Sequence, residues 1–360
     1  MIWMALILTF SILIQTWHWY RIFQPPKQQK HLIFSHTPKI FISVIICFHR
    51  PWTSIPRVLK RLCEQTYPHF EVLLINDGPV KLQPSHLDWI QQQSKFKYII
   101  HNKKRPGKKD ALITGIRSSQ HEWLALTDID CIPGPHWLRS IVHHLPDHPG
   151  IILGYSPYLP SSGLLHFMIE QETLLTAIQY LGWARYGTPY MGVGRNLIYH
   201  RTVYEKTTFQ SHLHLPSGDD DLFVNEAART FPTYEMLTSE SIVYSTPPET
   251  WRSWWRQKQR HLSIGKYYSL SSKVRISLFS VCLGIEKSFL LFLLITRHYK
   301  LFVFFICLKI ILTLAPLRKT YHRMNRDNHF PKMWIYEWMH FFYLILASPW
   351  IFLKTKRKWD

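Results

Sequence analysis

The sequence predicts an α/β protein with a doubly wound sheet, flanking helices and membrane helices near both ends of the chain. Two observations predict the sheet. Short β-branched apolar runs alternate with stretches of helical periodicity, and polar residues follow each run. The third observation is a set of long apolar segments, one at the start and the others after residue 270. The 360 residues accommodate one large domain plus these segments.

Residues 1–20 are expected to form an uncleaved transmembrane anchor. They contain no Asp, Glu, Lys or Arg and end in a Trp and Tyr cluster before Arg21. A signal peptide would begin with a basic segment and end at a small-residue cleavage site, and neither is present. We expect a linker at 21–39 after this anchor.

The C-terminal region, 271–360, is expected to be membrane-associated. Segments 276–296 and 301–317 are long and apolar enough to span a bilayer. Segment 333–353 contains Glu337 and His340, so it is expected to be either a further span or an interfacial helix. Lys and Arg flank the segments, and the positive-inside rule places residues 40–270 in the cytoplasm. These features predict a multi-pass protein of the cytoplasmic (inner) membrane that contacts membrane lipids.

The net charge also bears on partners. There are 43 Lys and Arg against 23 Asp and Glu, a formal charge of +20. Such a surplus suits nucleic acid, anionic lipid or phosphorylated substrates. Because many basic residues flank membrane segments, nucleic acid is not expected. The five cysteines are odd in number and widely spaced, as expected of reduced packing residues.

The predicted sheet begins with the β-branched run at 40–48, followed by a helical pattern. Further strands are expected at 70–77, 97–102 and 122–130, with a helix ahead of the last strand. This alternation indicates βαβ units, so a single domain is expected at 40–270. In such sheets, ligands bind beyond the carboxyl ends of the strands.

Asp128 and Asp130 stand at the end of the fourth predicted strand. Residues i and i+2 of a strand point to the same face, so the two carboxylates would repel each other unless a cation lies between them. Paired carboxylates suit Mg²⁺ or Mn²⁺, which take further ligands from phosphates. A simple Asp-capped turn is the alternative for this pattern.

Two other strand ends carry candidate donor-binding groups. Asp77, in the turn sequence Asn-Asp-Gly, could accept from the base or ribose of a nucleotide, or could simply end the strand. The basic loop at 103–109 precedes a helix, so it is either a phosphate cradle or a solvated loop. It lacks the spacing of a P-loop.

Two later segments are also candidates. Asp219, Asp220 and Asp221 precede a helix and are either a cap or a general base whose pKa is raised by its like-charged neighbours. The segment 250–268 interleaves Trp and Arg. It could lie at a membrane interface, bind single-stranded nucleic acid, or clamp a diphosphate.

Taken in order, these motifs resemble a membrane-anchored family 2 glycosyltransferase with a GT-A fold, over roughly residues 40–270. The resemblance rests on six segments in the order of the family, read as SVIICFHRP, NDGP, GKKDAL for G-K-x-x-A-L, TDID for D-x-D, GDDDLF for the acidic base motif and QKQRH for Q-x-x-R-W.

The resemblance implies a role for each motif. Asp128 and Asp130 would hold a divalent cation, Mg²⁺ or Mn²⁺, that bridges the diphosphate of a nucleotide sugar. Asp77 would contact the nucleoside, and Lys108 would lie near the diphosphate. Asp220 would be the base that deprotonates the acceptor hydroxyl, with Asp219 and Asp221 as the alternatives one residue away.

The resemblance extends to two further groups. Gln257, Arg260 and His261 match Q-x-x-R-W with His in place of Trp, and Trp254 or Trp255 could supply the missing aromatic surface. The segment at 190–201 resembles the glycine-bearing segment beneath the donor sugar, and its candidate donor-binding residues are Gly192, Gly194 and Arg195.

The expected function is therefore inverting transfer of a sugar from a nucleotide-sugar donor to a lipid-linked or membrane-associated glycan. A metal-dependent nucleotidyl- or phosphotransferase is one alternative, but it leaves the acidic triplet and QKQRH without a role. A non-enzymatic basic membrane protein that binds nucleic acid or anionic lipid is the other. It predicts that basic residues dominate the clefts, whereas acids occupy the strand ends of this chain.

Overall fold

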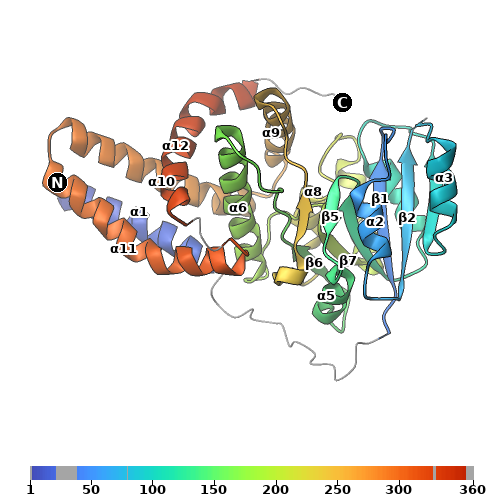
Figure 1. Cartoon of the computed structure of the whole chain (residues 1–360). Coiled ribbons are helices and arrows are strands. Elements are labelled where there is room, and N and C mark those ends of the chain that lie inside the picture. Colours follow the sequence, from blue (N-terminus) through green and yellow to red (C-terminus); the bar gives the residue numbers. More distant parts are fainter. Residues whose placement is uncertain (1, 22–38, 79, 327–329, 354–360) are drawn as a thin grey trace.

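The computed structural model describes residues 2–21, 39–78, 80–326 and 330–353 (Figure 1). Nearly all of the predicted linker, 21–39, and the last seven residues of the predicted C-terminal region lie outside the described residues. The domain boundaries drawn from the sequence remain predictions.

The first half of the sheet has the predicted parallel strands. They are β1 (Ile42–Phe48), β2 (Phe70–Asp77), β3 (Phe96–His101) and β4 (Trp123–Asp128). The intervening helices are α2 (Arg57–Cys63), α3 (Pro84–Gln91) and α4 (Lys109–Ser118). Strand β1 pairs in parallel with both β2 and β4, so it is central in this half and its seven residues are buried. Buried β-branched runs of this kind form parallel strands covered on both faces.

The second half of the sheet makes it mixed. Strand β7 (Leu197–His200) pairs antiparallel with β4 and β6 (Ile151–Gly154), and β6 pairs in parallel with β8 (Thr233–Met236). The strand order is β3-β2-β1-β4-β7-β6-β8. The prediction of a doubly wound mixed sheet is confirmed.

A second sheet of two strands joins β5 (Cys131–Pro133) to β9 (Val243–Ser245) in antiparallel register. It bears on the Asp128 and Asp130 pair. Strand β4 ends at Asp128, and Asp130 lies in the turn before β5. The prediction that both carboxylates extend from one continuous strand is therefore wrong, because the chain turns at residue 129 to reach β9.

Helices cover both faces of the main sheet. Alternate residues of β1 point to opposite faces, as the period of a strand requires. Val44 and Ile46 pack with α2, α3 and α5 (Trp137–His144), whereas Ile45 and Cys47 pack with the helices of the other face. On that second face, α4, α6 (Leu164–Ala184), α7 (Arg201–Thr207) and α8 (Asp221–Ala227) contribute buried residues to one hydrophobic core. Two short 3₁₀ helices, Gln210–His212 and Ser239–Ser241, complete this part of the chain.

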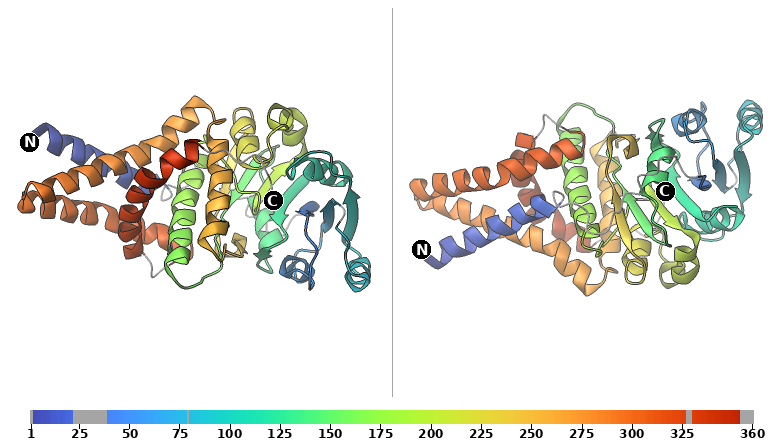
Figure 2. Two further views of the ribbon diagram at one scale, coloured as in Figure 1. Left: turned by 90° about the horizontal axis from the view of Figure 1, so that it is seen from above. Right: turned by 90° about the horizontal axis from the view of Figure 1, so that it is seen from below.

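The remaining helices are α1 (Ile2–Tyr20), α9 (Trp251–Gly265), α10 (Leu270–Ile295), α11 (Tyr299–Arg323) and α12 (Phe330–Leu353). Helices α1, α10 and α11 pack together and project away from the sheet, as both views in Figure 2 show. Within the described residues, these three helices are long and apolar enough to cross a membrane, and α12 is not among them. Helix α10 begins before the predicted span 276–296 and ends at Ile295, and α11 extends past both ends of the predicted span 301–317.

A polar cluster holds these helices together, and we call it the bundle charge cluster. Its members come from four helices and are at most 4% exposed: Gln15 of α1, Glu286 and Lys287 of α10, Lys309 of α11 and Glu337 of α12. Glu286 accepts from Gln15 at 2.7 Å, Lys287 at 2.8 Å and Lys309 at 2.6 Å. Glu337 pairs with both lysines. The predicted interfacial or spanning segment, 333–353, is thus tied through Glu337 to α10 and α11.

Candidate active site

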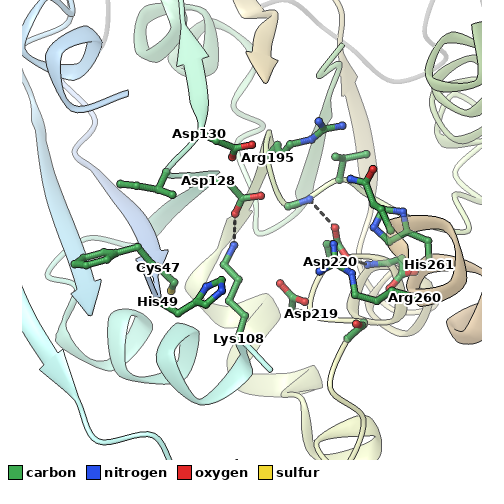
Figure 3. A pocket seen from close by; sticks show the side chains of 18 of the residues that line it. Cys47, His49, Lys108, Asp128, Asp130, Arg195, Asp219, Asp220, Arg260 and His261 are labelled. Carbon is green, nitrogen blue, oxygen red and sulfur yellow. Dashed lines mark hydrogen bonds and ion pairs between the residues drawn. The ribbon is translucent and has the colours of Figure 1, made fainter. Parts of the chain in front are cut away.

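A cavity of about 410 Å³ opens at the carboxyl ends of β1, β2 and β4, the edge at which the sequence predicts a ligand (Figure 3). It contains most of the predicted site residues. The cavity is lined by Asp77, Lys108, Asp128, Asp130, Gly194, Arg195, Asp219, Asp220, Asp221, Gln257, Arg260 and His261. Residues from 77 to 261 are thus brought to one place.

Asp128 and Asp130 lie on one side of the cavity, across from Asp219 and Asp220 (Figure 3). Asp128 ends β4, opposite Cys47 of β1, and forms an ion pair with Lys108. Although burial opposes its charge, this lysine holds the pKa of Asp128 below its usual value. Burial likewise opposes the charge of Lys108, but Asp128 and then Asp219 raise its pKa. The ammonium group of Lys108 therefore supplies part of the positive charge that is expected beside Asp128 and Asp130.

Asp130 is positioned by the small sheet. The pairing of Cys131 with Ser245 brings the Ser245 hydroxyl within 3.0 Å of Asp130 Oδ2, to which it donates. Enclosure by the cavity wall and the neighbouring Asp128 carboxylate raise the pKa of Asp130. Two carboxylates that disfavour each other's charge are the arrangement that a bound cation stabilises.

The carboxylates of Asp128 and Asp130 suit a divalent cation that prefers oxygen ligands. Two carboxylates at one wall leave further positions for diphosphate oxygens and water, which Mg²⁺ and Mn²⁺ accept. Within the described part of the chain, no group of three or more His, Cys, Asp or Glu side chains could hold a metal by itself. A cation at Asp128 and Asp130 would therefore need ligands from its substrate.

The acidic triplet lies in a loop, residues 212–220, and the first turn of α8; we call residues 212–220 the acidic loop. Asp220 is the N-cap of α8, and its Oδ1 accepts from Asp221 N at 2.8 Å. Its Oδ2 accepts from Gly194 N at 2.8 Å. A Cβ at Gly194 would lie 3.3 Å from this oxygen, so glycine permits the close approach. Asp220 thus both caps α8, as its sequence context allows, and lines the cavity.

The three acids differ in their surroundings. Burial and then Asp219 raise the pKa of Asp220 to about 6. Burial and then Asp220 raise the pKa of Asp221 to about 8, and the hydroxyl of Tyr268 donates to its Oδ2 at 2.9 Å. The pKa of Asp221 is thus raised further than that of Asp220, so Asp220 is the more readily ionised of the two. A base needs a free proton acceptor, so Asp220 is favoured over Asp221.

Asp77 lies at the other end of the cavity, where β2 ends. Its Oδ2 accepts from Lys103 Nζ at 2.9 Å, and its Oδ1 is buried without a hydrogen-bond partner. A buried acceptor of this kind is costly unless a donor reaches it. An N–H or O–H of a nucleoside would satisfy it. Two lysines of the predicted basic loop thus form ion pairs with acids of the cavity: Lys103 with Asp77 and Lys108 with Asp128.

Arg195 lies two residues before β7 in the chain and lines the cavity (Figure 3). Its guanidinium stacks 4.4 Å from the centroid of Tyr158 and donates to Ser156 O at 3.1 Å. Gln257 Nε2 donates to the Tyr158 hydroxyl at 2.9 Å, which links α9 to this wall. Arg260 and His261, on the next turn of α9, reach the cavity as well (Figure 3).

Three predicted residues lie elsewhere. Trp255 does not line the cavity; it packs against Trp254 and against Tyr343 of α12. Trp254 is 5% exposed in the same cluster, so neither indole supplies an aromatic surface to the cavity. Gly192 is also outside the lining, beneath Val224 of α8.

Sequence reasoning missed several lining residues. His49 and Arg50 follow β1, and their position in CFHRP at a strand end was the available signal. Tyr158 lies in a stretch without regular structure apart from one isolated bridge, to Ser245, and no local pattern marks it.

Comparison with known proteins bears on this geometry. Residues 43–208 match the model of glycosyl transferase family 2. The segment includes Asp77, Lys108 and the pair Asp128 and Asp130, and it ends before the acidic triplet and α9. The family match therefore covers the part of the cavity that is formed by Asp77, Lys108, Asp128 and Asp130.

Two curated relatives carry related names. A protein of Haemophilus influenzae described as an uncharacterized glycosyltransferase is 28% identical over 175 residues, 48% of this chain and 49% of that protein. The probable glycosyltransferase YdaM of Bacillus subtilis is 23% identical over 289 residues, 75% of this chain and 65% of that protein. The matches thus span about half of the first relative and just under two thirds of the second.

A solved structure extends the likeness of fold. The mannosyltransferase PcManGT of Pyrobaculum calidifontis, in complex with GDP-Man and Mn²⁺, has a TM-score of 0.54 and 13% identity. The superposition covers 94% of this chain and 98% of that chain. At this identity it shows the fold alone, and the predicted GT-A type architecture is confirmed. The family match and the named relatives support a transferase enzyme.

Proposed function

We propose that this chain is an inverting glycosyltransferase that moves a sugar from a nucleotide-sugar donor to a lipid-linked or membrane-associated glycan. The observation that carries the proposal is the convergence, in one cavity, of the Asp128 and Asp130 pair with Asp220 on the opposite side. One site suits a diphosphate with its cation, and the other suits an acceptor hydroxyl.

On the donor side, Asp77 would accept from the nucleoside and Lys108 would move its ammonium group toward the diphosphate. Asp128 and Asp130 would hold a divalent cation, which neutralises the charge that develops on the leaving nucleoside diphosphate. Arg195 and Arg260 add fixed positive charge to the same cavity. Such preorganised charge favours the transition state over the ground state.

On the acceptor side, Asp220 would take the proton of the acceptor hydroxyl. The oxygen would then attack the anomeric carbon from the face opposite the diphosphate, forming one C–O bond as the other breaks. The anomeric configuration is inverted by this single displacement. The hydrogen bonds from Gly194 N and Asp221 N fix the direction of the Asp220 carboxylate.

The membrane assignment is part of the same proposal. Helix α9 lines the cavity through Gln257, Arg260 and His261, and α10 begins at Leu270, five residues after α9 ends. An acceptor held in the bilayer could reach the cavity along this connection. The basic flanks favour a multi-pass protein of the inner membrane, with the cavity on the cytoplasmic side.

A donor screen tests the proposal. Membranes containing the full chain are incubated with UDP-, GDP- and dTDP-sugars and Mn²⁺ or Mg²⁺, and release of nucleoside diphosphate is measured with product extraction into organic solvent. The expected result is release from one nucleotide class, with the labelled sugar in the lipid or glycan fraction. Release of pyrophosphate would favour a nucleotidyltransferase, and no metal-dependent release from any donor would contradict transfer.

A further inference from the structure

Lys109 is a buried cation that the mechanism above does not use. Its residue is 3% exposed, and its Nζ donates to the carbonyl oxygens of His212 at 2.7 Å, Leu215 at 3.0 Å and Ser217 at 2.6 Å. An ammonium group has three N–H donors, so these contacts use all of them. All three acceptors belong to the acidic loop.

We infer that Lys109 is a positioning residue that holds the acidic loop, and thereby Asp220, across the cavity from Asp128. The inference rests on the proposed function, since it concerns the placement of the proposed base. No family motif assigns this residue, because the position is variable in G-K-x-x-A-L.

The neighbouring backbone supports a rigid connection. Gly107 has φ +103°, and a Cβ on it would lie 2.3 Å from Pro216 O. The segment before α4 is thus packed directly against the acidic loop. Only glycine combines this φ with so close an approach.

The adjacent lysine points to the other side of the site. Lys108 pairs with Asp128, whereas Lys109 binds the acidic loop. The first turn of α4 therefore joins the two sides of the cavity through consecutive residues. A rigid helix turn between them sets the separation of the two carboxylate groups, on which in-line displacement depends.

Charge acts in the same direction as geometry. The acids Asp219, Asp221 and Asp220 face Lys109, and His212 lies beside it. Burial lowers the pKa of Lys109 to about 8, against the effect of the three acids. Removal of this cation takes a positive charge from the surroundings of Asp220 and Asp221 and so raises the pKa values of these two groups further.

Replacement of Lys109 by methionine tests the inference. In the full chain in detergent or nanodiscs, binding of UDP and GDP is measured by calorimetry with Mn²⁺, and turnover is measured with the donor found by the screen. We expect Lys109→Met to bind nucleotide within about threefold of the parent, to lose about 100-fold in kcat, and to shift the acidic limb of the kcat profile to higher pH. Lys109→Arg, which keeps the charge, should leave the limb in place.

Lys60→Met is the matched control, because Lys60 is exposed on α2 and lines no part of the cavity. It should change neither kcat nor the pH limb. Unchanged kcat in Lys109→Met, or equal loss of nucleotide binding and kcat, would overturn the positioning role.

If Lys109→Met is not recovered as a folded protein, Lys109→Gln replaces it, and its nucleotide binding, kcat and pH profile are expected to change in the same way. Lys109→Arg should still keep the acidic limb of the kcat profile at the pH of the parent. Absence of turnover in the parent with every donor would overturn the proposed function and this inference with it. Turnover in the parent that these variants leave unaltered would overturn the inference alone.

Discussion

The cavity and the bundle charge cluster both enclose several charges, and they are built differently. The cavity is lined by six aspartates against four Lys or Arg residues, Arg50, Lys108, Arg195 and Arg260. The bundle charge cluster pairs two glutamates with two lysines, and Gln15 completes the hydrogen bonds. One cluster has an excess of acid and the other is balanced.

An excess of buried acid is expected of a site that binds a cation, whereas a balanced cluster is expected of a contact between helices. In the cavity, burial and neighbouring acids raise the pKa values of Asp130, Asp220 and Asp221, so these carboxylates favour a cation or a proton. In the bundle, each glutamate already contacts two lysines. Buried charges that compensate one another need no ligand, but removal of one partner is costly.

The largest expected effect is on the proposed base. Asp220→Asn should lower turnover about 1,000-fold, because an amide cannot accept the proton of the acceptor hydroxyl. Binding of nucleoside diphosphate with Mn²⁺ should persist, as Asn can still accept from Gly194 N. Turnover and equilibrium binding measured on the same preparation check this expectation.

Asp221→Asn and Asp88→Asn serve as controls for that substitution. Burial and Asp220 raise the pKa of Asp221 and so favour its protonated form, and Asp221→Asn should therefore retain turnover within about tenfold of the parent. Asp88 is exposed on α3 and should have no effect. Loss of turnover in Asp221→Asn, with little change in Asp220→Asn, would move the base by one residue.

The second prediction concerns the bundle. Glu337→Leu leaves Lys287 and Lys309 facing Glu286 alone, and it should lower the free energy of unfolding by about 3 kcal/mol. The additional change Lys287→Leu restores the balance of charge and should recover most of the loss. Thermal unfolding in nanodiscs is the measurement.

The exposed Glu205 on α7 provides the matched control, since Glu205→Leu removes an acid that contacts no bundle residue. A double variant as unstable as Glu337→Leu would show that the cluster is not stabilised by balance of charge.

The third prediction returns to the cavity. Asp130→Asn should weaken binding of Mn²⁺ in the presence of nucleoside diphosphate about 100-fold, because one of two carboxylate ligands is lost. Electron paramagnetic resonance of free Mn²⁺ measures this directly. Unaltered Mn²⁺ binding would place the cation elsewhere. Thermal stability should hold, since Asn can still accept from Ser245.

The smallest effect is that of pH. Asp220 must be ionised to accept a proton, and its pKa is raised to about 6, so kcat should fall by half near pH 6 as acid is added. A kcat profile between pH 4.5 and 8 at saturating donor checks this. A limb near pH 4 would mean that the base is a carboxylate with an ordinary pKa.

The sequence predicted the first half of the sheet well and the second half poorly. Strands β1 and β2 have seven and eight residues, and most of these are apolar, so their pattern is visible locally. Strands β6, β7 and β8 have four residues each, too short to distinguish from loops by periodicity. Helix α6 was not predicted, because buried residues lie on all of its sides and leave no pattern of one apolar face.

The site shows the same division. Asp77 and Asp128 were identified because each ends an apolar strand, a pattern contained in a few residues. The position of Asp130 depends on pairing with Ser245, 115 residues away. Trp255 shares the helix of Arg260 but packs toward α12, a direction that no spacing within α9 reveals.

By itself, the sequence determined which chemical groups stand at the strand ends and where the long apolar helices lie, because both depend on local periodicity. Only the tertiary structure decided how the buried acids of the cavity differ in pKa, which lysine binds the acidic loop, and which charges cancel inside the bundle. Those outcomes depend on burial and on neighbours such as Gln15 and Glu286, 271 residues apart, and no local pattern contains that separation.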